Sequence, residues 1–317
     1  MERQPNAQFS EAARLPNFLV IGAMRAGTTT LYQTLRSHPA VHMAAVKEAN
    51  FFALENGSTD LPLTQSSADI FVTNSVASPI AYSRLFEGAG DAKAIGEVSP
   101  SYLYSAGAHR RISERLPGVR LIVVLRDPVD RAYSAYLRRA GVVPDPEMFL
   151  KVAEDEHRAF HEGVPTDHYP LLVGGLYSMH LRPYMHTFSS GQIWVRLFED
   201  LWTDHDRSFA ELYDFIEVER IGTDAPHLNK SGVPRYQMLD RVLRGGARVK
   251  GYTKRHLPAR AVRTLIDLKQ RVEDRNLIDP ERLPASIRAD LIDRYFLTDI
   301  EQTEALIQRD LSSWRTP

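Results

Sequence analysis

A turn rich in glycine and threonine near the amino terminus has the residue types and spacing of a phosphate-binding loop. Gly22 and Gly27 have four residues between them, and Thr28, Thr29 and Thr30 follow directly. An apolar run precedes the turn and a helical pattern follows it, so the backbone can close around an anion and the helix can direct its first N–H groups at it. The pattern predicts phosphate binding, with a purely structural strand-to-helix turn as the alternative.

The cation of this turn is displaced from the place that it has in nucleoside triphosphatases. Those enzymes use a lysine beside the Ser or Thr of the loop, together with Mg²⁺, to hold the β- and γ-phosphates. Here the lysine position is Thr28, and the cation is Arg25, inside the turn. Hydrolysis of ATP or GTP is therefore disfavoured, and a P-loop kinase-like phosphotransferase with a displaced cation is an alternative function.

A second candidate anion site follows the apolar run 120–125. Arg126 comes directly after this run, and Ser134 comes eight residues later on a predicted helix. An arginine can bind a phosphate through two N–H groups, and a hydroxyl about two helical turns further on can add another hydrogen bond. The alternative is structural, with Arg126 paired to Asp127 or Asp130.

These side chains need a scaffold, and the hydrophobic pattern predicts one in which strands and helices alternate. Apolar runs predict strands at 17–21, 95–97, 120–125 and 192–197. Helical patterns cover residues 28–36, 105–116, 128–140, 146–160, 176–188 and 204–216. We therefore expect an α/β fold of the P-loop-like, three-layer type, with a central, mainly parallel sheet flanked by helices.

The rest of the chain carries weaker signals. Residues 55–78 are rich in Ser, Thr and Asp and predict a surface loop, and residues 1–16 predict a flexible amino-terminal segment. Helical patterns at 260–275 and 284–311 indicate that residues 230–317 are mostly helical. Because no repeat or convincing boundary is found, we expect a single domain over all 317 residues.

Composition excludes several classes of protein. The chain is 43% hydrophobic and 25% charged with a net charge of −1, which is typical of a soluble globular protein. It has no cysteine, so disulfides, thiolate nucleophiles and thiolate metal sites are excluded. No apolar run approaches the roughly 20 residues that span a bilayer, and the first residues have no signal-peptide pattern, so we expect a cytoplasmic location.

Positive charge is concentrated late in the chain. Residues 230–271 hold twelve Lys or Arg against Asp240 and Asp267. Such a stretch can attract an anionic ligand or can be a solvated helix surface, and a non-catalytic anion-binding or scaffold protein is a third hypothesis. Few aromatic residues are interleaved with these charges, so nucleic-acid binding is not expected.

Taken together and in this order, the two anion sites resemble those of the sulfotransferases that use 3′-phosphoadenosine 5′-phosphosulfate (PAPS). The likeness is greatest to the heparan sulfate sulfotransferases and their bacterial relatives. In that family a loop of the form (K/R)xGTTxL binds the 5′-phosphosulfate, and an arginine with a serine eight residues on binds the 3′-phosphate. The resemblance implies that PAPS contacts Arg25, Ala26, Gly27, Thr28, Thr29, Thr30, Arg126 and Ser134.

Further segments extend the resemblance along most of the chain. Residues 46–52 match the KExxFF segment of the family, and residues 96–102 match its GExxPxY segment. Other matches are at 175–177, 195–201, 227–232 and 309–314, of which 227–232 resembles a loop that closes over the nucleotide. The resemblance adds as candidate nucleotide contacts Tyr177, Lys230, Ser231 and Gly232. A tyrosine at a helix start can equally be a core residue.

The resemblance implies sulfuryl transfer from PAPS to a hydroxyl or amine of a glycan, lipid or small-molecule acceptor, which leaves adenosine 3′,5′-bisphosphate. Glu48 of the KExxFF segment is then the expected catalytic base, and Phe51 and Phe52 are expected to raise its pKa by desolvation. A surface ion pair between Glu48 and Lys47 is the alternative, and Glu97 is the second candidate for the base.

The leaving phosphate oxygen needs stabilisation, for which Arg25 and Lys47 are the candidates. Arginine keeps the charge of the lysine found in most of the family but cannot donate a proton, whereas Lys47 can. No metal is expected to be required, since the transferred group has little net charge. His157 and His161 are four residues apart, but Arg158 replaces the glutamate of an HExxH zinc motif. The oligomeric state is left open.

Overall fold

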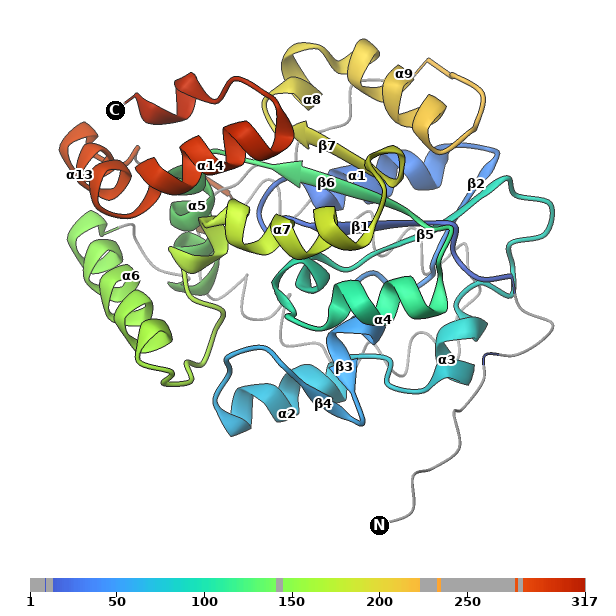
Figure 1. Ribbon diagram of the computed structural model, residues 1–317, viewed down its shortest axis with the longest axis horizontal. Helices are drawn as coiled ribbons and strands as arrows, with labels where there is room; N and C mark the ends of the chain where they lie inside the picture. Colours follow the sequence, from blue (N-terminus) through green and yellow to red (C-terminus); the bar gives the residue numbers. More distant parts are fainter. Residues whose placement is uncertain are drawn as a thin grey trace.

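A parallel sheet forms the centre of the computed structural model, which describes residue 9 and residues 14–140, 145–222, 233–234, 277–278 and 282–316 (Figure 1). In this part of the chain the sheet has five strands in the order β2-β5-β1-β6-β7, and every neighbouring pair is parallel. The strands are β1 (Phe18–Gly22), β2 (Val41–Met43), β5 (Ala94–Val98), β6 (Arg120–Leu125) and β7 (Ile193–Leu197). Every residue of β1 and β5 is buried, as a parallel sheet covered on both faces requires.

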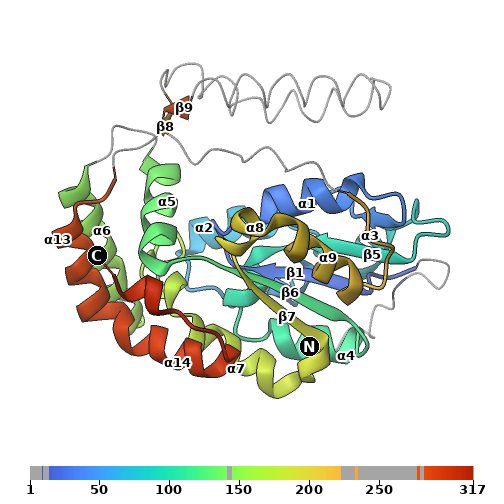
Figure 2. The same cartoon turned by 90° about the horizontal axis from the view of Figure 1, so that it is seen from above.

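Helices cover both faces of this sheet and give the three layers that the sequence predicts. One face carries α1 (Thr28–Ser37), α8 (Asp200–Thr203) and α9 (His205–Phe215), and the other carries α4 (Ala108–Arg115) and α7 (Tyr177–Thr187) (Figure 2). Beyond one end of the sheet lie α5 (Pro128–Ala140), α6 (Pro146–His161), α13 (Ala285–Leu291) and α14 (Leu297–Ile307) (Figure 1). The predicted α/β fold with a mainly parallel sheet is confirmed.

Short elements connect these layers. The 3₁₀ helices are η1 (Phe51–Ala53), η2 (Pro100–Tyr104), η3 (Val173–Gly175), η4 (Ser190–Gln192) and η6 (Ser312–Arg315), and η5 (Ile292–Phe296) is a π-helical turn. Two antiparallel pairs of short strands join β3 (Leu54–Glu55) to β4 (Ser58–Thr59) and β8 (Val233–Pro234) to β9 (Leu277–Ile278).

Residues 55–78 form strands and a helix instead of the predicted surface loop. This segment contains most of the β3–β4 hairpin and helix α2 (Gln65–Asn74), and α3 (Pro79–Arg84) follows it. No residue of α2 is buried, so this helix lacks the apolar stripe that would have indicated it. Helix α3 does carry start signals, because Pro79 is its first residue and the Ser78 hydroxyl accepts from the N–H of Ala81. Strand β2, with three residues, is too short for a periodicity to indicate it.

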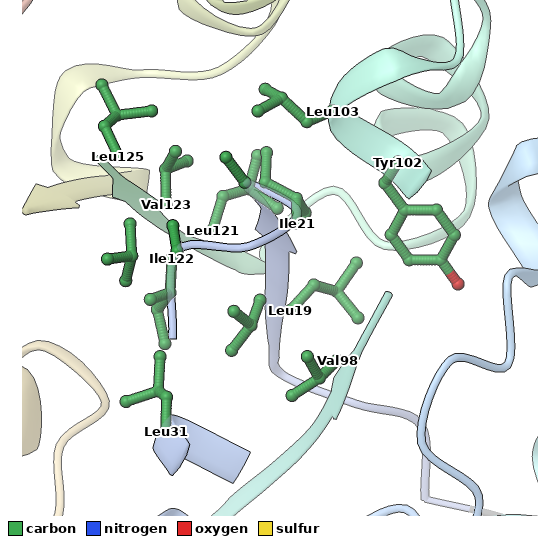
Figure 3. Packing of buried hydrophobic residues seen from close by; sticks show 14 of the residues in the cluster. Leu19, Ile21, Leu31, Val98, Tyr102, Leu103, Leu121, Ile122, Val123 and Leu125 are labelled. Carbon is green, nitrogen blue, oxygen red and sulfur yellow. The ribbon is translucent and has the colours of Figure 1, made fainter. Parts of the chain in front are cut away.

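The hydrophobic core fills the space between β1, β6 and η2 (Figure 3). Ile21 of β1 belongs to this core together with Leu121 and Val123 of β6 and Leu103 of η2. Leu103 also closes the end of β1, because a Cβ atom on Gly22 would lie 2.6 Å from Leu103 Cδ2. Only glycine therefore fits at the point where the phosphate-type turn begins.

Arg288 ties the C-terminal helices to α5. This side chain of α13 forms ion pairs with Asp127 and with Asp130, at 3.0 Å for Asp130. The helical pattern predicted over 284–311 is found as α13, η5 and α14, whereas residues 260–275 and most of 1–16 lie outside the described residues. Within the part of the chain that the structure describes, no helix is both long enough and apolar enough to cross a membrane.

Candidate active site

The loops that follow the strands meet at one edge of the sheet, because parallel strands have their carboxyl ends on the same side. In chain order, β2 and β5 are added on one side of β1, and β6 and β7 are then added on the other side. The point where the direction of strand addition reverses is the place where open α/β sheets bind their ligands. Main-chain hydrogen bonds join each loop to the end of a neighbouring strand, from Ala23 N–H to Val124 O of β6 (2.7 Å), Ser99 N–H to Val20 O of β1 (3.0 Å) and Glu48 N–H to Val98 O of β5 (2.8 Å). The predicted site segments therefore share this edge.

The phosphate-type turn leads directly into α1. Gly27 has a φ of +80°, a left-handed conformation that suits glycine, and α1 begins at the next residue. Gly27 has no side chain to cap the helix and the first turn has no acidic residue, so the N–H groups of this turn are left for an anion. The Ala26 N–H differs, since it donates to a carbonyl within the turn at 3.2 Å. Thr28 and Thr30 are buried, and Thr29 is partly exposed.

The two predicted anion sites touch each other. Arg25 Nε donates to Ser134 Oγ at 3.1 Å, and Arg126 Nη1 donates to the Arg25 carbonyl oxygen at 3.2 Å. Arg25 has a φ of +70°, which is uncommon for a residue with a Cβ atom, and such conformations are concentrated at functional sites. Arg126 also lies over the ring of Phe198, 4.9 Å from its centroid. One ligand with two anionic groups can therefore reach both sites.

The carboxylates beside Arg126 have another partner. Asp127 and Asp130 both form ion pairs with Arg288, and Asp127 Oδ1 accepts from the N–H groups of Val129 and Asp130 at the start of α5. Burial raises the pKa of Asp127, and the hydrogen bond from Arg288 opposes this rise. The structural alternative, in which these carboxylates neutralise Arg126, is therefore not the arrangement that forms.

Tyr177 lies behind Arg126 in the core. The residue is 1% exposed, its hydroxyl donates to the Arg126 carbonyl oxygen at 2.7 Å, and the same hydroxyl accepts from the Arg126 N–H at 3.4 Å. Burial raises the pKa of Tyr177 above its ordinary value. The hydroxyl is thus used to hold the Arg126 main chain, in agreement with the core alternative rather than with a direct nucleotide contact. The other predicted contacts, Lys230, Ser231 and Gly232, lie outside the described residues.

The Lys47–Glu48 pair is at the same edge of the sheet. Lys47 Nζ lies 2.5 Å from Glu48 Oε1, and the Glu48 side chain is 51% exposed. Phe51 and Phe52 are buried, and the ring of Phe51 stacks on Tyr82 with the centroids 4.4 Å apart. The ion pair with Lys47 forms and half of the Glu48 side chain is exposed, while the role of Glu48 as the base stays a prediction.

Known proteins match the region that carries these features. The model of the family described as "Sulfotransferase family" matches residues 16–221, more than half of the chain. The chain belongs to the sulfotransferase family. The predicted resemblance to PAPS-dependent members is confirmed, and membership of this family favours sulfuryl transfer over the kinase-like alternative.

Two curated relatives and one solved structure illustrate the likeness. Heparan sulfate glucosamine 3-O-sulfotransferase 3A1 of Mus musculus is 30% identical over 212 residues, 67% of this chain and 48% of that protein. Carbohydrate sulfotransferase 15 of Mus musculus is 24% identical over 292 residues, 73% of this chain and 51% of that protein. The chain thus spans about half the length of these relatives. The crystal structure of a sulfotransferase from Alicyclobacillus acidocaldarius supports the fold, with a TM-score of 0.67 over 95% of this chain and 99% of that one at 24% identity.

Tyr104 holds the phosphate-type turn of this protein, and no motif singled it out. Its hydroxyl accepts from the Met24 N–H at 3.2 Å and donates to the Gly174 carbonyl oxygen at 3.3 Å. The residue is buried, and its ring packs against Tyr169. Its place two residues after Tyr102 of the GExxPxY segment is the signal that could have identified it.

Glu97, the second candidate for the base, is fully buried. Its Oε1 atom accepts from the hydroxyls of Tyr82 (3.2 Å) and Tyr102, and its Oε2 atom accepts from the hydroxyl of Ser99 (2.8 Å). Burial raises the pKa of Glu97 to about 7, and the hydrogen bonds from these hydroxyls oppose the rise. With no exposed surface and both oxygens engaged, this carboxyl group is poorly placed to take a proton from an acceptor.

The two histidines of α6 are neighbours, with the Nε2 atoms of His157 and His161 at 3.1 Å. Among residues 14–140, 145–222 and 282–316, no three His, Asp or Glu side chains are grouped so that they could hold a metal ion. Nearly all of the basic stretch 230–271 lies outside the described residues. Apart from the Glu48 carboxylate, the groups described above at the sheet edge are guanidinium, ammonium, hydroxyl and main-chain N–H groups, which suit an anion.

Proposed function

We propose that this protein transfers a sulfuryl group from PAPS to a hydroxyl or amine of a glycan or similar acceptor by in-line displacement. The observation that carries the proposal is the contact of Arg25, in the phosphate-type turn, with Ser134 and Arg126. A nucleotide with anionic groups at both its 3′ and 5′ positions can place one anionic group in each of the two predicted anion sites. Membership of the family and the names of the relatives support the reaction.

In the proposed complex the 5′-phosphosulfate lies at the start of α1, where Arg25, the first N–H groups and the hydroxyls of Thr29 and Thr30 bind it. The 3′-phosphate is bound by Arg126 and Ser134. Arg25 and Ser134 hydrogen-bond to each other at 3.1 Å, so we expect each of them to exchange this contact for phosphate oxygens. The buried hydroxyls of Tyr104 and Tyr177 hold the main chain of the two sites and limit the reorganisation that binding requires.

Sulfuryl transfer needs a base for the acceptor and positive charge for the leaving group. Glu48 takes the proton of the acceptor hydroxyl or amine while the acceptor oxygen or nitrogen forms its bond to sulfur. The bond from sulfur to the 5′-phosphate oxygen breaks, and its electron pair stays on that oxygen, which gives adenosine 3′,5′-bisphosphate. Arg25 and Lys47 stabilise this charge, and of the two only Lys47 can also supply a proton.

A glycan is the acceptor class that the proposal favours, with a lipid or a small molecule as the alternatives. The relatives are named for heparan sulfate glucosamine and for carbohydrate. The basic stretch 230–271 supplies positive charge that would attract an acidic sugar chain. A cytoplasmic location and the absence of a metal requirement stay predictions.

Binding and transfer assays test the proposal in two steps. Calorimetry should give clearly tighter binding of adenosine 3′,5′-bisphosphate than of adenosine 5′-monophosphate, which lacks one of the two anionic ends. Isotopically labelled PAPS should then transfer its label to heparan sulfate or to another member of a pool of glycans, lipids and phenols. No affinity for the bisphosphate would overturn the proposal, and Mg²⁺-dependent phosphorylation by ATP would favour the kinase-like alternative.

A further inference from the structure

We propose that Glu97 is a positioning residue for the Lys47–Glu48 pair: its buried carboxyl group holds residues 48–53 in the one conformation that presents Glu48 at the sheet edge. The inference rests on the proposed function, because it takes Glu48 as the base. It assigns Glu97 a role that differs from the role of the base itself, for which its burial is unsuited.

The segment that carries Glu48 has a conformation that its own residues do not favour. Glu48 has a φ of +63° and Asn50 a φ of +54°, so two residues with Cβ atoms are left-handed within three positions. Side-chain sterics disfavour this region, so such a segment persists only where the surroundings hold it. The direction of the Glu48 side chain therefore depends on the contacts that residues 48–53 make with the rest of the protein.

The main chain of this segment is held by the residues that follow β5. The N–H of Glu48 donates to the Val98 carbonyl oxygen at 2.8 Å, and the N–H of Asn50 donates to Ser99 Oγ at 3.0 Å. The Ser99 hydroxyl in turn donates to Glu97 Oε2 at 2.8 Å. Because Glu97 takes the hydroxyl hydrogen, a lone pair of the Ser99 oxygen is left to accept from Asn50. Glu97 thus fixes the orientation of the hydroxyl that accepts from the main chain of the left-handed turn, whereas the Ser101 hydroxyl donates to the Asn50 side chain at 2.7 Å.

The aromatic end of the segment is tied to the same carboxyl group. Glu97 Oε1 accepts from the hydroxyls of Tyr82 and Tyr102. Phe51 stacks on the Tyr82 ring, with centroids 4.4 Å apart at 17°, and Phe52 meets the Tyr102 ring edge-on, with centroids 5.6 Å apart. Glu97 therefore orients the rings against which the two phenylalanines pack, as well as the serine that binds Asn50.

Three hydroxyls from three elements converge on this carboxyl group, and all four residues have zero exposure. Tyr82 comes from α3, Ser99 from the residue after β5 and Tyr102 from η2. Burying an ionisable group is costly unless it is fully hydrogen-bonded, and here each oxygen has at least one hydroxyl partner. A hydrocarbon side chain would fill the space without fixing any of these hydroxyls, so the polar network specifies one geometry for residues 48–53.

The first test uses Ser99→Ala, which cuts the link between Glu97 and Asn50 and leaves the tyrosines in place. Hydrogen exchange in residues 45–53 should become faster, whereas exchange in the turn 22–31 should stay unchanged. The kcat for transfer from PAPS to heparan sulfate should fall about tenfold, with the affinity for adenosine 3′,5′-bisphosphate within about twofold of wild type. The matched control is Ser208→Ala, since Ser208 of α9 is also buried but donates to the main-chain carbonyl oxygen of Asp200 in α8, and its kcat should not change.

The second test asks whether Glu97 acts through Glu48. Glu97→Gln should lower kcat in the wild-type background and lower it much less in a Glu48→Gln background, because the orientation of residue 48 no longer matters there. Equal losses in both backgrounds would overturn the proposal. So would a reversed result in which Glu97→Gln abolishes transfer and Glu48→Gln is mild, since that would make Glu97 the base.

Failure of the proposed function is distinguishable from failure of this inference. If the wild-type protein does not bind adenosine 3′,5′-bisphosphate, sulfuryl transfer is wrong, whatever the variants do. The exchange rates need neither donor nor acceptor, so they still report whether Glu97 and Ser99 hold the segment. Unchanged exchange of residues 45–53 in Ser99→Ala would overturn the positioning role, even if sulfuryl transfer is established.

Discussion

The nucleotide side and the acceptor side of the proposed site differ in how many groups contribute to their function. On the nucleotide side, several groups are proposed to bind one nucleotide, with Arg25 and the N–H groups of α1 at its 5′ end and Arg126 at its 3′ end, and the two arginines already contact each other. On the acceptor side, one exposed carboxylate, that of Glu48, is held by a left-handed turn. Loss of one group should therefore lower nucleotide affinity moderately, whereas loss of Glu48 should stop transfer almost completely. The comparison separates affinity from rate, and each prediction below tests one side of it.

The largest effect is expected at Glu48. Glu48→Gln keeps the size of the side chain and removes the base, so kcat should fall by about 10² to 10⁴ while the affinity for adenosine 3′,5′-bisphosphate stays unchanged. Steady-state kinetics with labelled PAPS and calorimetry give the two numbers. The matched control is Glu114→Gln, because Glu114 is similarly exposed, at 57%, and its partner is Arg110 of the same helix, α4. A Glu48→Gln protein with wild-type kcat would remove the distinction between the two sides.

The network below the acceptor side should make stability depend on pH. Burial raises the pKa of Glu97 from an ordinary 4.5 to about 7, so between these values the folded protein keeps a proton that the unfolded chain has released. The contribution of Glu97 to the unfolding free energy should therefore be fully present below pH 4.5 and be lost as the pH rises through 7, by roughly 3 kcal/mol. Chemical denaturation at a series of pH values measures it.

Glu97→Gln isolates this contribution, since glutamine does not titrate. Burial lowers the pKa of His180 to about 4, and this residue acts in the opposite direction, because its folded form resists protonation as the pH falls. The quantity to compare is therefore the difference in unfolding free energy between wild type and Glu97→Gln at each pH. A difference that is constant from pH 4.5 to 7 would mean that the carboxyl group is not perturbed by its burial.

On the nucleotide side, Arg126→Ala should weaken binding of adenosine 3′,5′-bisphosphate by about 10- to 100-fold, the usual value of hydrogen bonds to a charged group. Binding of adenosine 5′-monophosphate should hardly change, because it has no 3′-phosphate to lose. Arg182→Ala, an exposed arginine of α7 that binds Gln302, is the control. An equal loss for both nucleotides would place Arg126 at the 5′ end and would contradict the proposed orientation.

The same difference between the two sides explains how much of the site could be predicted from the sequence. The nucleotide side could be predicted because each half is a strand, a turn and a helix start in continuous sequence, as at Gly22–Thr28 and at Leu125–Pro128. The contact between Arg25 and Ser134 then follows from the pairing of β1 with β6, which the order of alternating strands and helices makes plausible. The fold and this side of the site are therefore set mainly by local patterns.

The acceptor side was harder to predict because its geometry depends on distant residues. The left-handed φ angles of Glu48 and Asn50 turn the chain, so the phenylalanines that follow enter the core while Glu48 remains half exposed. Nothing in the spacing of KExxFF indicates this turn. One hydrogen bond that holds it joins Asn50 to Ser99, 49 residues away, and the role of Glu97 depends on such contacts between residues distant in the sequence.

The smallest effect is expected at Tyr177, which acts on the nucleotide side without facing the ligand. Tyr177→Phe removes the hydroxyl that both donates to the carbonyl oxygen of Arg126 and accepts from its N–H, so the Arg126 main chain loses one anchor. Affinity for adenosine 3′,5′-bisphosphate should fall about three- to tenfold, with kcat at saturation unchanged, as for one neutral hydrogen bond worth about 1 kcal/mol. The control is Tyr32→Phe in α1, since Tyr32 also donates to a main-chain oxygen, that of Ala44, at 2.8 Å. Both variants should lose similar thermal stability, but only Tyr177→Phe should bind adenosine 3′,5′-bisphosphate more weakly. If Tyr177→Phe and Tyr32→Phe bind it equally well, Tyr177 is a core residue without a role in nucleotide binding.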